Sequence, residues 1–399
     1  MLKIDDLEVA LDADAGLVKA IDGLTLSIER GETFALVGES GCGKSMTALA
    51  LMRLLPDNGA ITNGNVELEG QDVLALPESR MRAVRGGRIG MIFQEPSTSL
   101  NPVMRVGEQV VEAIQTHTAL RGNAARAKAI DWMRKVGIPE PERRFDEYPF
   151  RLSGGQKQRV MIAMTLASEP DFLIADEPTT ALDVTIQAQI LELLKQLQKE
   201  QGMGLLLITH DLAVVSGMAQ RVALMYAGQI VEVAQADEFF AAPKHPYARL
   251  LLQALPGTNK RGYSLAAIPG TVPALSQAFE GCRFAPRCDK VFDDCHGTRP
   301  ELLDLGRRGV RCLLYASGVR PSDKASVAAT PPLPLGEGWG EGSRPAAPAL
   351  LEVRNLRVSF PLRRGLLQRS HGAFIAVDDV SFEIAPGRTL ALVGESGCG

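Results

Sequence analysis

The chain has 399 residues, of which 45% are hydrophobic and 23% are charged, and its formal net charge is -4. No apolar run approaches the roughly 20 residues of a membrane-spanning helix, and the mild acidity gives no support for a general nucleic-acid-binding surface. No charged-then-apolar leader with a cleavage site opens the chain. We therefore expect a cytosolic protein, whose cysteines serve as metal ligands or free thiols rather than disulfides.

Residues 1 to about 235 alternate short apolar runs with helical patterns. Runs such as FALV and LLLI predict buried strands at residues 34–37, 88–93, 172–175 and 205–208. Helical patterns predict helices at residues 44–55 and 184–199, and a mostly helical insert at about 100–165. This alternation predicts an α/β fold built on a largely parallel sheet.

The string GESGCGKS follows the first of these strands and opens the first helix. It matches the phosphate-binding pattern G-x-x-x-x-G-K-S in the strand-to-helix context that this motif requires. Lys44 is expected to bridge the β- and γ-phosphates, and Ser45 to offer a hydroxyl to Mg²⁺ beside a favourable helix dipole. The predicted nucleotide-binding residues of this loop are Gly38, Glu39, Ser40, Gly41, Cys42, Gly43, Lys44 and Ser45.

Two acids, Asp176 and Glu177, directly follow the predicted strand at residues 172–175. Asp176 can hold the Mg²⁺ shell, and Glu177 can polarise an attacking water as a general base. An acidic pair after a strand is usually a solvated turn. Its combination with the lysine-containing loop instead indicates a site that hydrolyses a nucleotide.

The string LSGGQ at residues 152–156 opens another helical stretch, where Ser153 and the amides of Gly154 and Gly155 form an anion site. With Gln94 and the strings TALD and ITHD, the order of motifs over about residues 1–235 resembles the nucleotide-binding domain of ABC ATPases. The resemblance implies a P-loop NTPase fold with a helical subdomain, and ATP and Mg²⁺ as ligands. It also implies that the LSGGQ string caps the γ-phosphate bound by a second domain. The residues implied by this string are Ser153, Gly154, Gly155 and Gln156.

The same resemblance assigns roles to three further residues. Gln94 would contact Mg²⁺ and the attacking water, and Asp183 in TALD would join the nucleotide-binding set. His210 in ITHD would contact the γ-phosphate and position the water, although a lone histidine at a strand end is more often structural.

Residues 236–316 resemble the C-terminal extension of ATPases that serve dipeptide, oligopeptide and related nickel or glutathione importers. The strings HPY at residues 245–247 and FQEPSTSLNP at residues 93–102 are the most recognisable. Arginines in this extension would offset the charge of a metal cluster or be ordinary surface residues. They are Arg283, Arg287, Arg307, Arg308 and Arg311.

Four of the six cysteines fall in this extension: Cys282, Cys288, Cys295 and Cys312. Four thiolates can hold a 4Fe–4S cluster or a tetrahedral Zn²⁺ ion. The C-x2-C spacing of zinc knuckles is absent, and the resemblance implies the iron–sulfur cluster, with zinc and unliganded thiols as the alternatives. We expect the phosphate loop to fold in a core separate from this segment.

The beginning of the chain is repeated near its end. With a shift of 356 positions, residues 20–43 align with residues 376–399, and the run ALVGESGCG occurs in both. One repeat at domain distance predicts duplication of a whole domain, of the tandem-fused type. We expect a flexible Pro/Gly-rich linker at residues 317–349 and the truncated start of a second ABC domain at residues 350–399. Leu11 stands where the second copy has Phe360, so adenine contacts in the first domain are expected to be weak or purely aliphatic.

These resemblances imply an ATP-hydrolysing subunit that energises an ABC importer for peptides or related small solutes, on the cytoplasmic face of the inner membrane. Its expected partners are two membrane-spanning permease subunits, an extracytoplasmic solute-binding protein and a second ABC domain, with no nucleic acid. The alternative is a non-transport ABC ATPase of the translation or DNA-maintenance type. The interval between Gln94 and Ser153 is too short for the long coiled coil of chromosome-type members.

Overall fold

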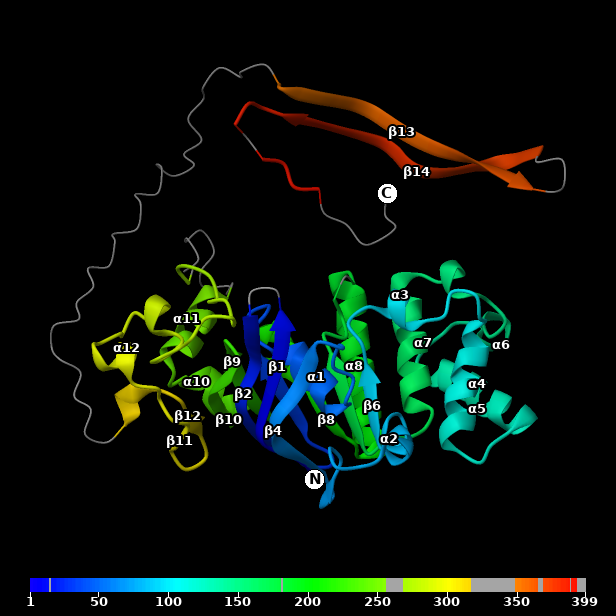
Figure 1. Cartoon of the computed structure of the whole chain (residues 1–399). Coiled ribbons are helices and arrows are strands. Elements are labelled where there is room, and N and C mark those ends of the chain that lie inside the picture. Colours follow the sequence, from blue (N-terminus) through cyan, green and yellow to red (C-terminus); the bar gives the residue numbers. More distant parts are fainter. Residues whose placement is uncertain are drawn as a thin grey trace. The chain divides into compact units, whose positions relative to one another are not determined.

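The computed structural model describes residues 1–13, 16–180, 182–255, 268–316, 349–364, 369–387 and 389–392. The chain divides into two compact units, Met1–Leu182 with Ile186–Val327, and Asp183–Thr185 with Ala328–Gly399 (Figure 1). Residues 317–348 of the linker predicted at 317–349, and the second copy of the glycine-rich string at residues 394–399, lie outside the described residues. No helix in the described ranges has the length and apolar character needed to cross a bilayer.

The centre of the first unit is an eight-stranded sheet with the order β11-β12-β10-β9-β3-β8-β7-β6. Its parallel strands are β3 (Thr33–Val37), β6 (Ile89–Ile92), β7 (Phe172–Asp176), β8 (Gly204–Thr209) and β9 (Arg221–Tyr226). The antiparallel strands are β10 (Gln229–Gln235), β11 (Leu303–Asp304) and β12 (Gly309–Val310). The four strands predicted from apolar runs are confirmed to within one residue at each end.

The connecting helices cover this sheet. They are α1 (Lys44–Leu51), α2 (Glu78–Val84), α8 (Val184–Gln201), α9 (Leu212–Met218), α10 (Ala236–Ala241), α11 (Pro246–Ala254) and α12 (Asp294–Gly297). The first helix ends four residues before its predicted end, since Arg53 takes a left-handed φ of 51° and Pro56 cannot continue a helix.

The predicted helical insert is also present, as α3 (Pro96–Ser99), α4 (Val106–His117), α5 (Gly122–Lys135), α6 (Pro141–Arg144) and α7 (Gly154–Leu166). Trp132, Ile114 and Phe145 are buried together in its core. Figure 1 shows α4–α7 at one end of the first unit and the elements of the extension, α10–α12 with β11 and β12, at the opposite end.

A second sheet in the first unit was not predicted from the sequence. It is antiparallel, with the order β2-β1-β4-β5, and consists of β1 (Leu2–Ala13), β2 (Gly16–Ile28), β4 (Gly59–Leu68) and β5 (Gln71–Asp72). Apolar residues of this sheet, such as Leu7 and Val66, share one buried core with Ile174 and Ile208 of the parallel sheet. The second sheet, which includes the β1–β2 hairpin, therefore packs against the parallel sheet through this core.

The extension has a small buried cluster of its own, formed by Ala285, Phe292, Cys295 and Leu313, and also contributes to a larger one shared with the parallel sheet. Ala35 and Val37 of β3 belong to the same buried cluster as Tyr247 and Phe284, against which Cys282 and Cys288 pack. The expectation of a core separate from the phosphate loop is therefore only partly met, because Tyr247 and Phe284 of the extension pack with residues of β3.

The interpretation of the extension's arginines as ordinary surface residues is wrong for four of the five. Three are buried and paired with acids of the sheet domain: Arg283 with Asp22, Arg287 with Glu39, and Arg308 with Glu232. Arg311 donates to the carbonyls of Ile230 and Pro300. These side chains attach the extension to the rest of the unit, and among the five only Arg307 is exposed.

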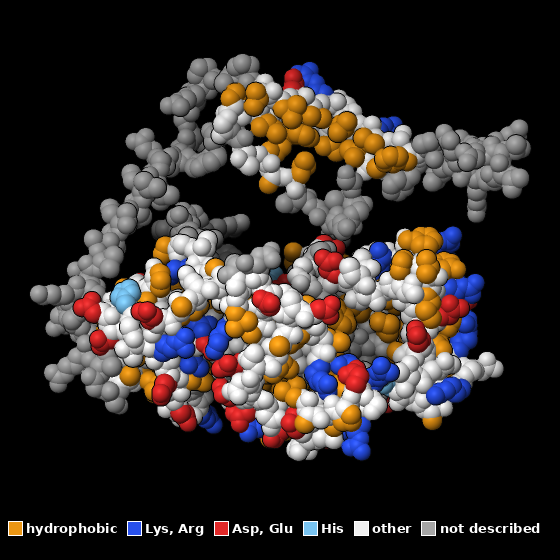
Figure 2. Space-filling view, in the orientation of Figure 1, with side chains coloured by type: hydrophobic (Ala, Val, Ile, Leu, Met, Phe, Trp, Pro, Cys, Tyr) orange, Lys and Arg blue, Asp and Glu red, His pale blue; other side chains and the backbone are white. Residues whose placement is uncertain are grey.

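The second unit contains a hairpin of β13 (Leu351–Arg364) and β14 (Arg369–Ile384). Its pairs Leu351–Ile384, Leu356–Val380 and Val358–Val377 repeat the pairs Leu2–Ile28, Leu7–Leu24 and Val9–Ile21 of β1 and β2. The left-handed residues Asp6 and Asn355 also correspond. Apolar side chains gather on the face of this hairpin seen in Figure 2, and Leu351, Leu356 and Ile375 are exposed.

Candidate functional site

The glycine-rich loop between β3 and α1 is packed tightly against two neighbouring strands. A Cβ at Gly43 would lie 2.4 Å from the carbonyl oxygen of Ala20, and one at Gly38 would lie 2.3 Å from that of Met225. Gly43 also has a left-handed φ of 109°. Lys44 is 5% exposed, and its Nζ donates to the carbonyls of Gly38 and Glu39, both at 2.9 Å. The loop thus encloses a single cationic group.

Asp176, at the end of β7, lies against the first turn of α1. The hydroxyl of Ser45 donates to its Oδ1 at 3.1 Å. Burial raises the pKa of Asp176, although the hydrogen bond from Ser45 and the charge of Lys44 oppose this shift. The parallel strands β3 and β7 bring these two oxygen-bearing side chains to the same edge of the sheet.

Glu177 is held by three side chains from separate parts of the chain. Its carboxylate accepts hydrogen bonds from Nε2 of Gln94 at 3.2 Å and from the hydroxyl of Thr180 at 2.9 Å, and Nδ1 of His210 lies 3.1 Å from Oε1. Burial opposes ionisation of Glu177, but the hydrogen bonds from His210 and Thr180 outweigh it and lower the pKa. The backbone of Glu177 has a left-handed φ of 45°, which is uncommon for a residue other than glycine.

Lys44, Ser45, Gln94, Glu177 and His210 line one cavity of about 590 Å³, a volume in the range of small-molecule sites. The predicted residues Gly38, Cys42 and Asp176 are not among its lining residues. The structure brings together most of the predicted residues here, and apolar residues complete the lining: Leu11, Val18, Ala20, Met46 and Leu275. The predicted residues that line the cavity are Glu39, Ser40, Gly41, Gly43, Lys44, Ser45, Gln94, Glu177 and His210. Sequence reasoning missed Thr180 and Leu275. Thr180 follows Glu177 by three residues, which was an available signal, whereas nothing in the sequence connects Leu275 with the loop.

The LSGGQ residues are placed elsewhere. Ser153 is the N-cap of α7, where its hydroxyl accepts from the backbone N–H of Gln156 and the side chain of Gln156 accepts from the N–H of Ser153. Among the described residues that line the cavity, none comes from residues 153–156. The side chain of Gln158 in α7 donates to the carbonyl of Pro178 at 2.6 Å, which joins this helix to the turn that carries Glu177. Asp183 lies directly before α8.

The HPY string has a structural role beside the same loop. His245 is fully buried, and its Nδ1 accepts from the N–H of Tyr247 at 3.1 Å, which caps α11. Burial lowers the pKa of His245 to about 3, so the ring is neutral. The hydroxyl of Tyr247 accepts from the backbone N–H of Glu39 at 3.3 Å. The extension therefore contacts the glycine-rich loop directly.

The four cysteines of the extension line one small cavity of about 10 Å³, together with His245, Phe284 and Phe292. Burial raises the pKa of the Cys288 thiol to about 12 and that of Cys312 to about 11, so these thiols are protonated unless a metal ion displaces the protons. Within the described ranges no group of three or more His, Cys, Asp or Glu side chains is arranged to hold a metal ion. The donor set suits a metal, but the side chains are not in a ligating geometry.

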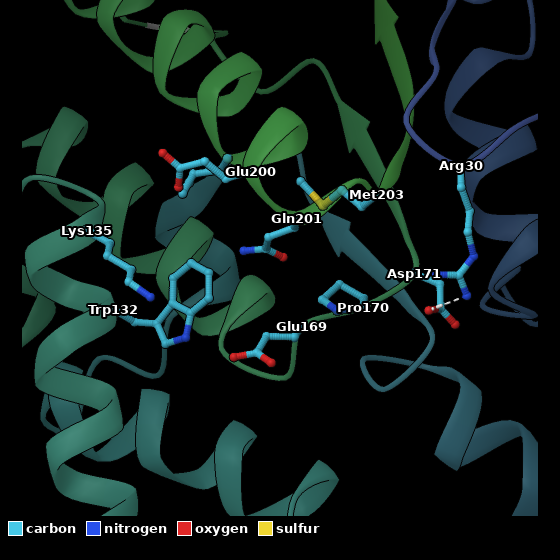
Figure 3. Close-up of a pocket in the computed structure, with 10 residues that line it drawn as sticks. Arg30, Trp132, Lys135, Glu169, Pro170, Asp171, Glu200, Gln201 and Met203 are labelled. Atoms are coloured by element: carbon cyan, nitrogen blue, oxygen red, sulfur yellow. Dashed lines mark hydrogen bonds and ion pairs between the residues drawn. The ribbon is translucent and has the colours of Figure 1, made fainter.

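A separate cavity of about 470 Å³ lies where α5 and α8 approach the turn before β7 (Figure 3). Its lining includes Trp132, Lys135, Glu169 and the ion pair between Arg30 and Asp171, whose N–O distance is 2.6 Å. None of the predicted site residues is among the residues that line it.

Comparison with known proteins agrees with this geometry. The chain is 47% identical over 317 residues to the oligopeptide transport ATP-binding protein AppD of Bacillus subtilis, a match that covers 79% of this chain and 97% of that protein. The chain belongs to the oligopeptide transport ATP-binding proteins of ABC transporters. A family model described as ABC transporter matches residues 21–180, and one described as oligopeptide/dipeptide transporter, C-terminal region, matches residues 231–295.

Two further matches show how much of this chain resembles a longer relative and a solved structure. The oligopeptide transport ATP-binding protein OppD of Mycobacterium tuberculosis is 41% identical over 406 residues, which cover all of this chain and 65% of that protein. The chain thus spans about two thirds of the length of that relative. The dimeric structure of the ATP-binding cassette MJ0796 bound to ADP and Pi has a TM-score of 0.54 and 28% identity, and covers 59% of this chain and 99% of that chain. The first unit therefore has the P-loop fold of ABC ATPases.

Proposed function

We propose that the chain is an ATP-hydrolysing subunit that energises an ABC importer for peptides or related small solutes. The observation that carries this proposal is the position of Glu177, whose carboxylate is held by Gln94 and His210 at the cavity that also contains Lys44. A strained, ionised carboxylate beside a phosphate-binding loop is suited to orient a water for attack on a γ-phosphate.

Each side chain around this carboxylate has a proposed task. Lys44 would pair with the β- and γ-phosphates in place of the loop carbonyls that it contacts. Ser45 and Asp176, whose oxygen atoms lie 3.1 Å apart, would hold Mg²⁺ with Gln94, because Mg²⁺ binds through few protein oxygens plus the substrate phosphates. Glu177 would accept the proton of the attacking water, and His210 would orient that water and the γ-phosphate.

The LSGGQ residues are proposed to act on a nucleotide held by a second ABC domain. Their location away from the cavity supports this, as does the dimeric state named for MJ0796. The N-terminus of α7, with Ser153, Gly154, Gly155 and Gln156, would supply an anion-binding cap, and Asp183 would lie in the same interface.

We propose the same domain organisation that the sequence predicts. An ABC domain at residues 1–235 with a helical insert at about 100–165 would be followed by the importer-type extension at 236–316, a linker at 317–349 and the start of a second ABC domain at 350–399. The pairing of β13 and β14, which repeats that of β1 and β2, supports the last assignment. Such a protein would act at the cytoplasmic face of the inner membrane, with two permease subunits, an extracytoplasmic solute-binding protein and no nucleic acid as partner.

The cysteine segment is proposed to hold a 4Fe–4S cluster, with zinc and free thiols as the alternatives. Its support is that Cys282, Cys288, Cys295 and Cys312 face one cavity, since four thiolates suit either metal centre. Iron and acid-labile sulfide in anaerobically purified protein, both absent from the Cys288→Ser variant, would agree with the cluster. Zinc without iron would contradict it.

Replacement of Glu177 by Gln tests the ATPase assignment. The variant should bind ATP but lose nearly all turnover, because it keeps the phosphate contacts and loses the base. Glu192→Gln, an exposed residue of α8, is the matched control and should hydrolyse ATP as the unmodified protein does. Undiminished turnover in Glu177→Gln would contradict the proposal, and co-purification with ribosomes rather than permease subunits would favour the non-transport alternative.

A further inference from the structure

The cavity at the phosphate loop has two chemically distinct kinds of lining residue. Its lining combines the loop and the polar side chains around Glu177 with aliphatic side chains. We call the part lined by Leu11, Val18 and Leu275 its aliphatic end. Val18 pairs with Leu11 across the β1–β2 hairpin, and it lies two residues along β2 from Ala20, which contacts the Gly43 position. At roughly 3.3 Å per strand residue, Val18 therefore lies about 7 Å along β2 from the residue that meets the loop.

Leu275 reaches this end from the extension, far from the loop in sequence. The residues before it, Ile268 and Val272, pack with it against the buried cluster that contains Tyr226 and Phe284. Leu275 is itself only partly buried, so part of its side chain faces the cavity that it lines.

Arg287 joins this segment to the phosphate loop. Its Nε donates to the carbonyl of Pro269 at 2.8 Å, and its Nη1 and Nη2 donate to the two carboxylate oxygens of Glu39 at 2.9 and 3.2 Å. The hydroxyl of Tyr226 lies 3.3 Å from Nη1, and Arg287 is only 7% exposed. One buried guanidinium, bound in fork geometry, thus fixes the segment that carries Leu275 relative to Glu39.

We propose that the extension completes the nucleotide site: Leu275 forms the aliphatic wall against the purine base, opposite Leu11 and Val18, and Arg287 is the residue that positions it. The inference rests on the proposed function, since it presupposes a nucleoside triphosphate in this cavity. It accounts for a domain without an aromatic residue at position 11, because two aliphatic walls can bury the faces of a base in place of one stacked ring.

The test compares a ligand that has a base with one that lacks it, on the full chain. The equilibrium affinities of Mg-ATP and of Mg-tripolyphosphate are measured by calorimetry for the unmodified protein and for Leu275→Ala. Leu275→Ala should lower the affinity for Mg-ATP by about tenfold, which is the effect of lost aliphatic contacts in a hydrophobic pocket. The affinity for Mg-tripolyphosphate should stay unchanged. Leu275→Met, which conserves volume, should restore the ATP affinity.

Further variants distinguish a direct contact of Leu275 with the base from the positioning of Leu275 by Arg287. Leu305→Ala changes an exposed leucine of the same extension that is not among the cavity-lining residues, and it should bind both ligands normally. Arg287→Ala should lower the affinity for both ligands, because Glu39 in the loop also loses its partner. Arg287→Lys should recover only part of the ATP affinity.

Equal ATP affinity in Leu275→Ala and the unmodified protein would overturn the inference while leaving the proposed function intact. An equal loss for both ligands in Leu275→Ala would also overturn it, because a base contact cannot act on tripolyphosphate. If the unmodified protein bound neither ligand, the proposed function itself would fail.

Discussion

The buried ion pair between Arg308 and Glu232 predicts a large and pH-dependent loss of stability when the arginine is removed. Nη1 of Arg308 lies 3.3 Å from Oε1 of Glu232, and their exposed fractions are 8% and 0%. The carboxylate also accepts from the backbone N–H groups of Lys244 and His245, at 3.0 and 2.7 Å. The Arg308→Met variant would keep the alkyl volume but leave a buried carboxylate with backbone donors only.

The magnitude follows from the burial of both groups. At this separation the attraction is about 5 kcal/mol with an effective dielectric constant of about 20, and breaking a buried pair typically costs about 3–5 kcal/mol. We expect Arg308→Met to lower the free energy of unfolding by about 3 kcal/mol or more. The exposed neighbour Arg307 provides the control, since Arg307→Met should stay within about 0.5 kcal/mol of the unmodified protein.

The pH dependence has a definite sign. Burial raises the pKa of Glu232 above its ordinary value, while the backbone hydrogen bonds and Arg308 oppose the shift, so loss of Arg308 should raise it further. A carboxyl group with a raised pKa in the folded state contributes stability at low pH that is lost as the pH rises through that pKa. Arg308→Met should therefore be destabilised less at about pH 5 than at about pH 8.

Urea denaturation of the full chain, followed by circular dichroism at both pH values, measures these differences. The double variant Glu232→Gln with Arg308→Met should be more stable than Arg308→Met at the higher pH, because it no longer buries an unpaired charge. An Arg308→Met protein as stable as the Arg307→Met control would refute the reasoning.

Two further predictions concern the nucleotide cavity. The affinity for GTP should be within about tenfold of that for ATP, because the described residues at the aliphatic end, Leu11, Val18 and Leu275, offer no side-chain hydrogen bonds to discriminate purines. Competition calorimetry measures the two affinities, and strong rejection of GTP would contradict the prediction. Gly43→Ala should lower the affinity for ATP at least about tenfold and lower the free energy of unfolding by about 1–3 kcal/mol, since its Cβ would meet the Ala20 carbonyl. Gly31→Ala, also left-handed but in open space, is its control and should retain normal ATP affinity.

The parallel sheet and the catalytic end of the cavity were predictable from local sequence. Buried parallel strands appear as continuous apolar runs, and the residues that follow β3, β7 and β8 converge because the carboxyl ends of parallel strands share one edge of the sheet. Lys44 and Glu177 were assigned to one site from their own motifs after β3 and β7. His210 and Gln94, which follow β8 and β6, were added by the resemblance to ABC ATPases.

The antiparallel sheet and the role of the extension were not predictable in this way. The strands β1 and β2 are bent by irregular pairing between Ile4 and Ala10, which breaks the simple alternation that identifies a strand. The contacts of Arg287 with Glu39 and of Arg283 with Asp22 join residues more than two hundred positions apart. No periodicity indicates such long-range pairs, which hold the extension against the loop.

The central claim is that this chain binds ATP through the loop that contains Lys44. Titration calorimetry of Mg-ATP into the full chain, the Lys44→Ala variant and the exposed-lysine control Lys199→Ala tests it most directly. We predict saturable binding by the unmodified chain and by Lys199→Ala, and an affinity about tenfold to a hundredfold lower in Lys44→Ala, the loss of a charge-assisted phosphate contact. Equal affinity in Lys44→Ala and the unmodified chain would contradict the account.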